Sequence, residues 1–370
     1  MIPQFDLRPQ LARLAAELAE AHARVLDSGR FILGAEVEAF ERAWADACGV
    51  AHAVGVGSGT DALELALRAA GVGAGDEVIT VAHTFVATAL AITAVGAVPV
   101  YVDVGPQDGL IDPELIGAAV TARTRAIIPV HLYGRCAKME PIQRVAAEHG
   151  LLVIEDAAQA HGARHGDRVA GAWGDLGCFS FYPTKNLGAL GDAGAVVTDD
   201  ADLAASLRRL RNYGEERKYH HLTPGRNSRL DEVQAAVLSV KLRHLSEFNR
   251  ARGAIAARYR AAIPAGGPLQ FLAFDPRTDA MHQAVVCARN RDGLRRHLAA
   301  AGIATQIHYP VPCHRQPALG RWPARAPLPV TERLADEVLS LPMYPELDDA
   351  QVVAVRTALA AWCRTAPPVE

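Results

Sequence analysis

The chain has 370 residues, half of them hydrophobic, which is enough for one large core and a smaller one, so two domains are expected. The net charge is -3 with acidic and basic residues interspersed, which provides no basic surface for nucleic acid. Six scattered cysteines form no CxxC pair, and the first residues resemble no signal peptide, so we expect reduced thiols in a cytoplasmic protein.

Apolar runs alternate with helical patterns through the first 210 residues. Two amphipathic helices come first, and Ser28-Gly29 and Gly49 end them. Strands are then expected at 54–56, 78–81, 98–104, 126–130, 151–154, 177–181 and 195–198, with helices near 61–70, 87–95, 113–120, 139–149 and 202–210. Continuous apolar strands that alternate with helices indicate an α/β fold with a mostly parallel sheet, which binds ligands at the carboxyl ends of its strands.

The stretch 78–102 is long enough to suggest a membrane span, and it carries no charged residue apart from His83. Its pattern changes from a β-like run to an alanine-rich helix and back, and Gly96 and Pro99 lie near its end. We therefore predict a buried strand, helix and strand, and no association with a membrane.

The chain after Arg229 changes its pattern. A long helical stretch to about residue 263 is predicted to bridge two domains. The remainder is predicted to be a smaller α+β domain, with strands at 283–288 and 304–309 and helices at 292–301, 331–339 and 349–362. We place the boundary after residue 245, which gives a large domain of residues 1–245, N-terminal helices included, and a second domain of residues 246–370.

One lysine stands alone in an apolar stretch. Residues 177–194 (GCFSFYPTKNLGALGDAG) run from an aromatic strand through a proline into a glycine-rich loop, and Lys185 is the only charged residue between Asp175 and Asp192. An ordinary surface lysine is the alternative. However, an isolated charge in apolar surroundings usually has a covalent or ionic partner, and burial makes an amine nucleophilic by lowering its pKa. Lys185 is therefore a candidate nucleophile.

A turn of small residues, 55–63 (GVGSGTDAL), joins a predicted strand to a predicted helix. Small residues let the backbone approach an anion, and the helix N-terminus offers free N–H groups to a phosphate. A dinucleotide fingerprint would need glycine at position 60, where the chain has Thr60. The turn thus favours a phosphate site over a dinucleotide site.

Other predicted strand ends carry candidate side chains. Asp156 follows the run at 151–154, where a carboxylate can keep a pyridine nitrogen protonated; capping the next helix is the alternative. Phe85 is suited to stack on a flat cofactor, although an aromatic residue there also fits a plain core. Residues 225–229 (GRNSR) fit a turn and a helix N-cap.

The polar loop 308–314 (HYPVPCH) lies in the predicted second domain. A metal site from His308, Cys313 and His314 would contain two prolines and lack a fourth ligand. We therefore predict no metal and favour a loop that faces a substrate.

Together these motifs resemble the sugar aminotransferases of the DegT/DnrJ/EryC1/StrS group, which are fold-type-I pyridoxal-phosphate enzymes. The match covers nearly the whole chain, and the order and spacing of its parts are highly specific. The matching motifs are SGTDAL at 58–63, HTFVAT at 83–88, EDAAQAHGA at 155–163, SFYPTKNLGALGDAGAV at 180–196, GRNSRLDEVQAA at 225–236, HYPVPCH at 308–314 and LPMYP at 341–345. The resemblance implies an aspartate aminotransferase-like large domain with a smaller C-terminal α+β domain.

The resemblance also implies how a cofactor is held. Lys185 would form a Schiff base with pyridoxal 5'-phosphate and later move the proton, while Asp156 would pair with the pyridine nitrogen. Gln159 would contact the hydroxyl side of the ring, and Phe85 would stack on it. The phosphate would be bound by Gly59, Thr60 and Ser180, and by Asn227 of a neighbouring subunit, which implies a homodimer with active sites at the subunit interface.

Subtypes of the group differ after the lysine. Many members that act at sugar C4 look like KxxxxGEGG, whereas this chain has KNLGALGDAG at 185–194 and NYGEERKY at 212–219. These motifs resemble enzymes that aminate a 3-keto sugar on a dTDP carrier. By resemblance, the substrate contacts would be Tyr182, Lys218, Arg229, His308 and Tyr309. Dehydratases of the group carry His in place of the lysine, so Lys185 argues against that activity.

The predicted function is a ping-pong transamination. L-glutamate would leave its amino group as pyridoxamine 5'-phosphate, and a dTDP-3-keto-6-deoxyhexose would then receive it. One alternative is a C4 or cyclitol aminotransferase of the same group. The others are a non-catalytic protein of this fold that binds a nucleotide sugar and a nicotinamide oxidoreductase built on residues 55–59.

Overall fold

The computed structural model describes residues 1–365, so residues 366–370, at the end of the predicted second domain, lie outside the described part. The central sheet has the strand order β1-β9-β8-β5-β4-β2-β3. Its strands are β1 (His52–Val56), β2 (Glu77–Val81), β3 (Val98–Val102), β4 (Thr124–Ile127), β5 (Leu152–Asp156), β8 (Leu176–Ser180) and β9 (Gly194–Thr198). Only β9 pairs antiparallel with its neighbours, so the predicted mostly parallel α/β sheet is confirmed.

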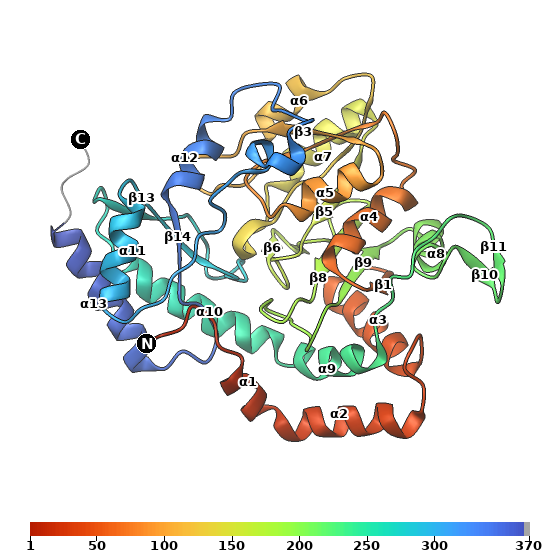
Figure 1. Cartoon of the computed structure of the whole chain (residues 1–370), viewed down its shortest axis with the longest axis horizontal. Helices are drawn as coiled ribbons and strands as arrows, with labels where there is room; N and C mark the ends of the chain where they lie inside the picture. The colour runs from red at the N-terminus through yellow and green to blue at the C-terminus, as the bar shows by residue number, and fades with distance from the viewer. Residues whose placement is uncertain (366–370) are drawn as a thin grey trace.

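Successive strand residues enter opposite cores, as the period of a β-strand requires. Ile79 and Val81 of β2 belong to one core, whereas Val78 packs with Leu65 on the other face. Helices cover both faces (Figure 1). They are α4 (Gly59–Ala69), α5 (Ala87–Ala94), α6 (Ile116–Ala119) after the 3-10 turn η1 (Pro113–Leu115), α7 (Met139–His149) and α8 (Ala201–Leu210), with the 3-10 turn η2 (Leu132–Gly134) between β4 and α7.

The uncharged stretch 78–102 forms β2, α5 and β3, as predicted. Val78 and Ile79 are fully buried, and Ala91 and Ile92 of α5 are almost or fully buried, so the apolar character of this stretch serves the core. Within residues 1–365, no helix has both the length and the apolar composition needed to cross a bilayer.

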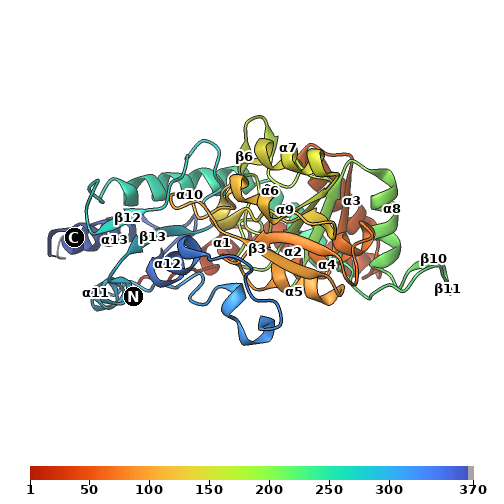
Figure 2. The same ribbon diagram turned by 90° about the horizontal axis from the view of Figure 1, so that it is seen from above.

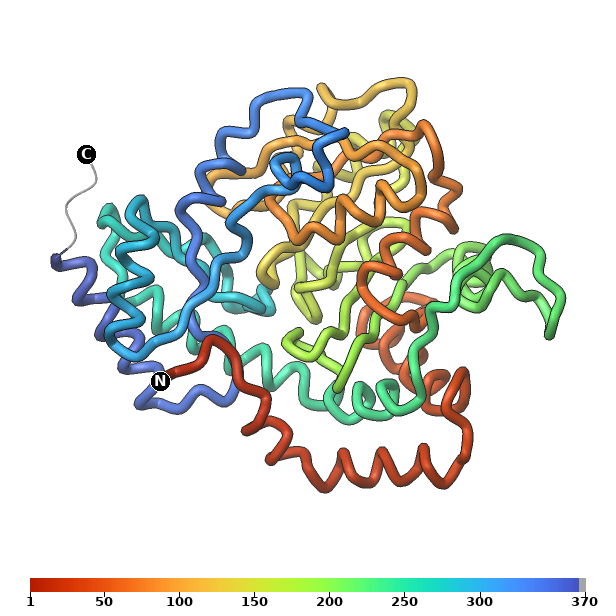
Figure 3. The backbone as a smooth tube through the Cα atoms, viewed as in Figure 1, coloured from red at the N-terminus to blue at the C-terminus, as the bar shows by residue number. Residues whose placement is uncertain are grey.

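The N-terminal helices are α1 (Arg8–Arg13), α2 (Ala15–Ser28) and α3 (Ala35–Cys48). Gly29 and Gly49 end α2 and α3 with positive φ angles of 61° and 73°, which glycine adopts without strain. The buried side of α2 (Leu18, Ala21, Val25) packs against α9 (Glu232–Leu242). Earlier still, Ile2 pairs with Ile303, so the first residues lie against the C-terminal part of the chain (Figure 3).

The single long helix predicted after Arg229 was wrong. The chain forms α9 and then α10 (Leu245–Arg260), with a break at Arg243 and His244. The two helices bury their apolar faces in different cores, because Ala235 packs near the central sheet and Tyr259 packs in the C-terminal core. The break lets both faces be buried. The domain boundary after residue 245 stays a prediction.

The C-terminal part contains a three-stranded antiparallel sheet of β12 (Leu269–Phe271), β13 (Ala284–Ala288) and β14 (Val338–Leu341). Its helices are α11 (Arg291–Ala300), α12 (Pro329–Glu337) and α13 (Asp349–Thr365), with 3-10 turns η3 (Cys313–Arg315) and η4 (Pro317–Leu319).

Two predictions for this part were wrong. Residues 304–309 form no strand: Gln306 makes a single bridge to Ser340. The helix expected to reach residue 339 ends at Glu337, and the chain continues directly into β14. No glycine or proline separates the two elements, so a short apolar run could not be told from the last turn of a helix.

Two small hairpins complete the structure. They are β6 (Arg164–His165) with β7 (Arg168–Val169), and β10 (Glu215–Arg217) with β11 (His220–His221). The β10–β11 hairpin projects from the body at the end opposite the C-terminal helices (Figures 1 and 2). Tyr219 at its turn is 84% exposed.

Candidate active site

A cavity of about 560 Å³ lies where the carboxyl ends of β1, β2, β4, β5 and β8 meet. Its size suits a small-molecule ligand. Of the residues predicted for the site, the following line it: Gly59, Thr60, Phe85, Asp156, Gln159, Ser180, Tyr182, Lys185, His308 and Tyr309. Motifs separated by up to 250 residues therefore converge at one edge of the sheet, as the strand pattern required.

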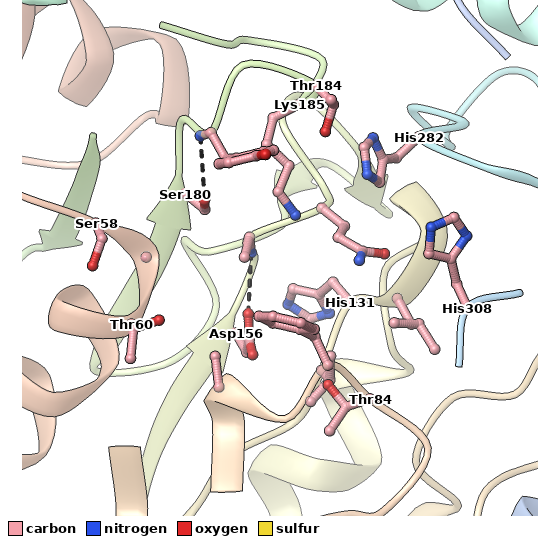
Figure 4. Close-up of a pocket in the computed structure, with 18 of the residues that line it drawn as sticks. Ser58, Thr60, Thr84, His131, Asp156, Ser180, Thr184, Lys185, His282 and His308 are labelled. Atoms are coloured by element: carbon pink, nitrogen blue, oxygen red, sulfur yellow. Dashed lines mark hydrogen bonds between the residues drawn. The ribbon is translucent and has the colours of Figure 1, made fainter. Parts of the chain in front are cut away.

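Lys185 points into the cavity, with Asp156 below it, Ser58 and Thr60 to one side and His282 and His308 to the other (Figure 4). Burial lowers the pKa of the Lys185 amine to about 8, although the charge of Asp156 opposes the shift. An amine with this pKa exists in both protonation states near neutral pH. Lys185 therefore has the chemistry of a nucleophile and a proton carrier.

Asp156 is held by two donors. The hydroxyl of Thr88 donates to Oδ2 at 2.7 Å, and the backbone N–H of Ala158 donates to Oδ1 at 3.2 Å. Thr84 contacts the Thr88 hydroxyl at 3.0 Å. Burial raises the pKa of Asp156, while the Thr88 and Ala158 donors act against that rise. The carboxylate is fixed in place and is suited to pair with a cation in the cavity.

The neighbouring carboxylate of Glu155 faces away from the cavity. It accepts hydrogen bonds from His131 and from the backbone N–H groups of Gly171, Trp173 and Gly174, each at 2.7 Å. Four donors saturate its oxygens, so Glu155 organises a loop. Of the two adjacent carboxylates, Asp156 is the one available for chemistry.

An anion cradle forms between the N-terminus of α4 and the end of β8. Ser58 caps α4 by accepting from the Asp61 N–H at 3.1 Å, which leaves the N–H groups of Gly59 and Thr60 at the cavity edge. A Cβ on Gly59 would stand 2.5 Å from the Ser180 Cβ. This close approach brings the hydroxyls of Ser58, Thr60 and Ser180 around one helix terminus, which is the geometry that binds a phosphate.

Gln159 has a fixed amide orientation. Its Oε1 accepts from the backbone N–H of Tyr133 at 2.8 Å, and its Nε2 donates to the Tyr309 hydroxyl at 3.0 Å. The amide therefore has a second N–H to donate to a ligand in the cavity. Phe85 is 52% exposed at the cavity wall, and its ring lies 5.6 Å from the Tyr309 ring. An open aromatic face is thus available to a flat ligand.

Asn227, Lys218 and Arg229 do not line this cavity. Lys218 is exposed on the β10–β11 hairpin, and Asn227 is exposed at the base of that hairpin, where it pairs with Asn212. Arg229 donates to the Asn212 side chain at 2.9 Å. The structure therefore does not bring these three predicted residues to the cavity of their own chain.

Sequence reasoning missed a polar wall of the cavity. His282, Gln283 and Gln306 come from the C-terminal part of the chain and face Lys185 across the cavity. No motif marks them: His282 and Gln283 come just before β13, and Gln306 makes a single bridge to Ser340 outside any strand. Thr84, His131, Thr184 and Asp192 also line the cavity.

The loop that holds His308, Cys313 and His314 does not gather these side chains. His308 Nδ1 lies 2.8 Å from the Ser340 hydroxyl, whereas His314 Nε2 lies 3.1 Å from Glu332. The Cys313 thiol is directed at the Thr84 carbonyl, 3.9 Å away. Each side chain has its own partner, and within residues 1–365 no group of three His, Cys, Asp or Glu side chains is arranged to hold a metal.

The chain matches a known aminotransferase family over most of its length. The model of the DegT/DnrJ/EryC1/StrS aminotransferase family matches residues 12–360. The chain belongs to this family. The aminotransferase is 50% identical over 363 residues to the dTDP-3-amino-3,4,6-trideoxy-alpha-D-glucose transaminase of Streptomyces venezuelae, covering 98% of this chain and 96% of that one. It is 47% identical to the UDP-N-acetyl-3-dehydro-alpha-D-glucosamine 3-aminotransferase of Acidithiobacillus ferrooxidans, covering 97% of each chain.

The fold of the aminotransferase agrees with a solved structure of the family. The crystal structure of S. venezuelae DesV in complex with a ketimine intermediate superposes with a TM-score of 0.96 at 49% identity, covering 99% of each chain. The predicted fold class and the prediction of a pyridoxal-phosphate-dependent aminotransferase are therefore confirmed, and a nicotinamide oxidoreductase is excluded.

The cavity of the aminotransferase fits pyridoxal phosphate on its own geometry. A buried amine of lowered pKa, a buried carboxylate with its oxygens already oriented, and a cradle that a Cβ on Gly59 would fill lie around one cavity. These groups match an aldehyde, a pyridinium nitrogen and a phosphate, respectively.

Proposed function

We propose that the aminotransferase moves the amino group of L-glutamate to C3 of a dTDP-linked 3-keto-6-deoxyhexose, which yields a dTDP-3-amino sugar. The observation that carries the chemistry is the buried Lys185 amine facing the buried Asp156 carboxylate in one cavity beside the anion cradle. The sugar position and the carrier rest on the 50% identical relative from S. venezuelae, whose name specifies a dTDP-3-amino sugar.

We expect the cofactor to be held by residues already in position. Asp156 would pair with the ring nitrogen, and the free N–H of Gln159 would donate to the ring hydroxyl. The Phe85 ring would cover the face of the cofactor, and the cradle at Gly59 and Ser180 would bind its phosphate. Bound pyridoxal phosphate supplies an electron sink that stabilises the carbon from which a proton is removed.

The proton transfers would belong to Lys185. Its Nζ, with a pKa of about 8, can take the proton from the α-carbon of glutamate and return it. The amine is buried and faces neutral imidazoles, since burial lowers the pKa of His308 to about 4 and that of His282 well below its ordinary value. The His308 ring can offer a hydrogen bond to a sugar without adding charge to the cavity.

A homodimer would complete the site. Among the described residues that line the cavity, Lys185 is the only lysine or arginine, whereas the proposed substrates carry a diphosphate and carboxylates. Anions of this kind need cations or many donors. Lys218, Arg229 and Asn227 lie outside the cavity of their own chain, and we infer that they serve the cavity of a second copy. We place the reaction in the cytoplasm, in keeping with six free thiols.

The test is an absorption spectrum of wild type and of Lys185→Ala, before and after L-glutamate, followed by keto sugars. We expect the visible band of the lysine-bound cofactor in wild type only, its loss with glutamate, and its return with a dTDP-3-keto sugar. A protein without the band, or with a band that glutamate leaves unchanged, would contradict an enzymatic role and favour the non-catalytic alternative.

The panel of acceptors decides the regiochemistry and the carrier. Recovery with a dTDP-4-keto sugar or a cyclitol ketone alone would keep the reaction class and overturn the C3 assignment. Recovery with a UDP-3-keto sugar alone would overturn only the dTDP carrier, and that outcome has a basis in the 47% identical relative named for a UDP sugar.

A further inference from the structure

The residue after Lys185 is fastened by the C-terminal part of the chain. Asn186 is 4% exposed, and its Nδ2 donates to Oδ1 of Asn249 on α10 at 2.8 Å and to the Ala280 carbonyl at 2.7 Å. Its Oδ1 lies 3.1 Å from Nδ1 of His282. All three partners follow residue 245. We propose that Asn186 and His282 are positioning residues, which set the place of Lys185 in the cavity by tying its loop to the C-terminal part.

The donors and acceptors leave one arrangement. Both hydrogens of Asn186 Nδ2 are used, so Oδ1 is its acceptor, and His282 must carry its proton on Nδ1. The His282 Nε2 is then an acceptor, 3.4 Å from the amide nitrogen of Gln283. Burial and the charge of Lys185 hold the pKa of His282 well below its ordinary value, which keeps the ring neutral.

The hydrogen bonds extend beyond this pair on both sides. Gln4 Nε2 donates to Oε1 of Gln283 at 2.8 Å, and Asn249 Nδ2 donates to the His161 carbonyl at 2.8 Å. The series therefore runs from Gln4 near the N-terminus, through Gln283 and His282, to Asn186. Gln4 is itself fixed, because its carbonyl accepts from the Met343 N–H at 3.1 Å.

The loop of Lys185 has few other side-chain anchors. Its tight turn is closed by backbone bonds, in which the Lys185 N–H donates to the Tyr182 carbonyl and the Ala189 N–H to the Phe181 carbonyl, both at 2.8 Å. Lys241 donates to the Gly188 carbonyl at 2.8 Å. A lysine side chain is long and flexible, so the position of its backbone decides which atoms Nζ reaches. Asn186 is the neighbouring residue that can fix that position.

The experiment uses two replacements of His282 that keep different nitrogens. His282→Asn places an amide nitrogen where Nδ1 lies and retains the donor to Asn186, whereas His282→Gln places its amide near Nε2 and loses that donor. Asn186→Ala removes all three bonds. The proposal rests on the proposed function, but it is tested first in cofactor-free protein. The measurement is the rate at which cyanate modifies Lys185 as a function of pH. Exposed Lys218 serves as the internal reference.

We expect Asn186→Ala and His282→Gln to change the Lys185 rate by about threefold or more and to lower kcat by about tenfold, since small displacements of reacting groups cost up to about 100-fold. His282→Asn should stay near wild type in the Lys185 modification rate and in kcat. In the loaded protein, the pH at which the visible band changes should shift in the same two variants. His297→Ala, which removes a hydrogen bond to the Ala358 carbonyl far from the cavity, is the control for a purely structural loss.

Equal Lys185 rates and equal kcat values in His282→Asn and His282→Gln would overturn the proposal. A His282→Gln variant closer to wild type than His282→Asn would also overturn it, because His282 would then act on the substrate through Nε2. Loss of keto-sugar turnover in every protein, wild type included, would contradict the proposed function. The cyanate labelling would still decide the positioning of Lys185 in that case.

Discussion

Gly59 and Ser180 approach each other so closely that a Cβ on residue 59 would stand 2.5 Å from the Ser180 Cβ. Gly59 begins α4 and Ser180 ends β8, so this contact places a helix N-terminus against the end of a central strand. The contact is also what forms the anion cradle. The preference for glycine here comes from the close approach of two segments, since the backbone of Gly59 does not adopt a positive φ.

Gly59→Ala is therefore expected to weaken cofactor binding by about tenfold or more, because overpacking of about 1–3 kcal/mol must move the helix or the strand. The measurement is a titration of cofactor-free protein with pyridoxal phosphate. Gly117→Ala in α6 is the matched control, since nothing lies within 4 Å of a Cβ at that position. An unchanged affinity in Gly59→Ala would show that the phosphate binds elsewhere.

Thr88→Val is expected to lower kcat by about 10- to 100-fold, because a hydrogen bond to a charged group is worth about 1.5–3 kcal/mol. The lost donor would raise the pKa of Asp156 further, so the acidic limb of the pH–rate profile should move to higher pH. Thr88→Ser keeps the hydroxyl and should restore both properties. Thr80→Val removes a buried bond of 2.9 Å to the Ile128 carbonyl and should reduce stability alone. A profile that does not move in Thr88→Val would refute the role of Thr88.

Much of the site followed from the sequence because its residues end strands. Asp156, Ser180 and Phe85 each stand at or just past a buried apolar run, and parallel strands end at one edge of the sheet. The isolation of Lys185 among apolar residues correctly indicated that its surroundings lower the pKa of its amine. These features depend on local pattern and on one rule of topology, so a single sequence was enough.

The opposite wall of the cavity could not be predicted from the sequence. His282 and Gln306 reach the cavity through the packing of the C-terminal part on the central sheet, which no local period encodes. The same limit explains β14, whose apolar run reads equally well as the end of α12. It also explains why Asn227 and Lys218, which belong to matching motifs, lie outside the cavity of their own chain.

Acid sensitivity should depend on Glu77, which lies at the amino end of β2 and away from the cavity. Hydrogen bonds from Arg325, Thr121 and Arg123 lower the pKa of this buried carboxyl from 4.5 to about 2. A folded-state pKa below the unfolded value contributes stability above the unfolded pKa, and that contribution is lost as the pH falls toward the folded pKa. Glu77→Gln should destabilise the protein at neutral pH.

The difference in free energy of unfolding between wild type and Glu77→Gln should become smaller as the pH falls from 4.5 to about 2. Urea unfolding at a series of pH values measures it, and Glu114→Gln, at a surface position of η1, is the control. A deficit that stays constant through this window would mean that the two arginines contribute nothing specific to Glu77.

The subunit origin of Asn227 can be decided by complementation. Lys185 lines the cavity of its own chain, whereas Asn227 is proposed to serve that of the partner. In a heterodimer of Lys185→Ala with Asn227→Ala, one site then receives both changes and the other receives neither. A C2 dimer should therefore recover about half of wild-type activity per heterodimer, after the heterodimer is isolated by two different affinity tags.

Lys185→Ala paired with Asp156→Ala is the matched control, because both residues line the cavity of their own chain and each site keeps one defect. Recovery in the first pair and not in the second is the expected result. Asn227→Ala alone should be inactive, and no recovery in the first pair would then place Asn227 in the site of its own chain.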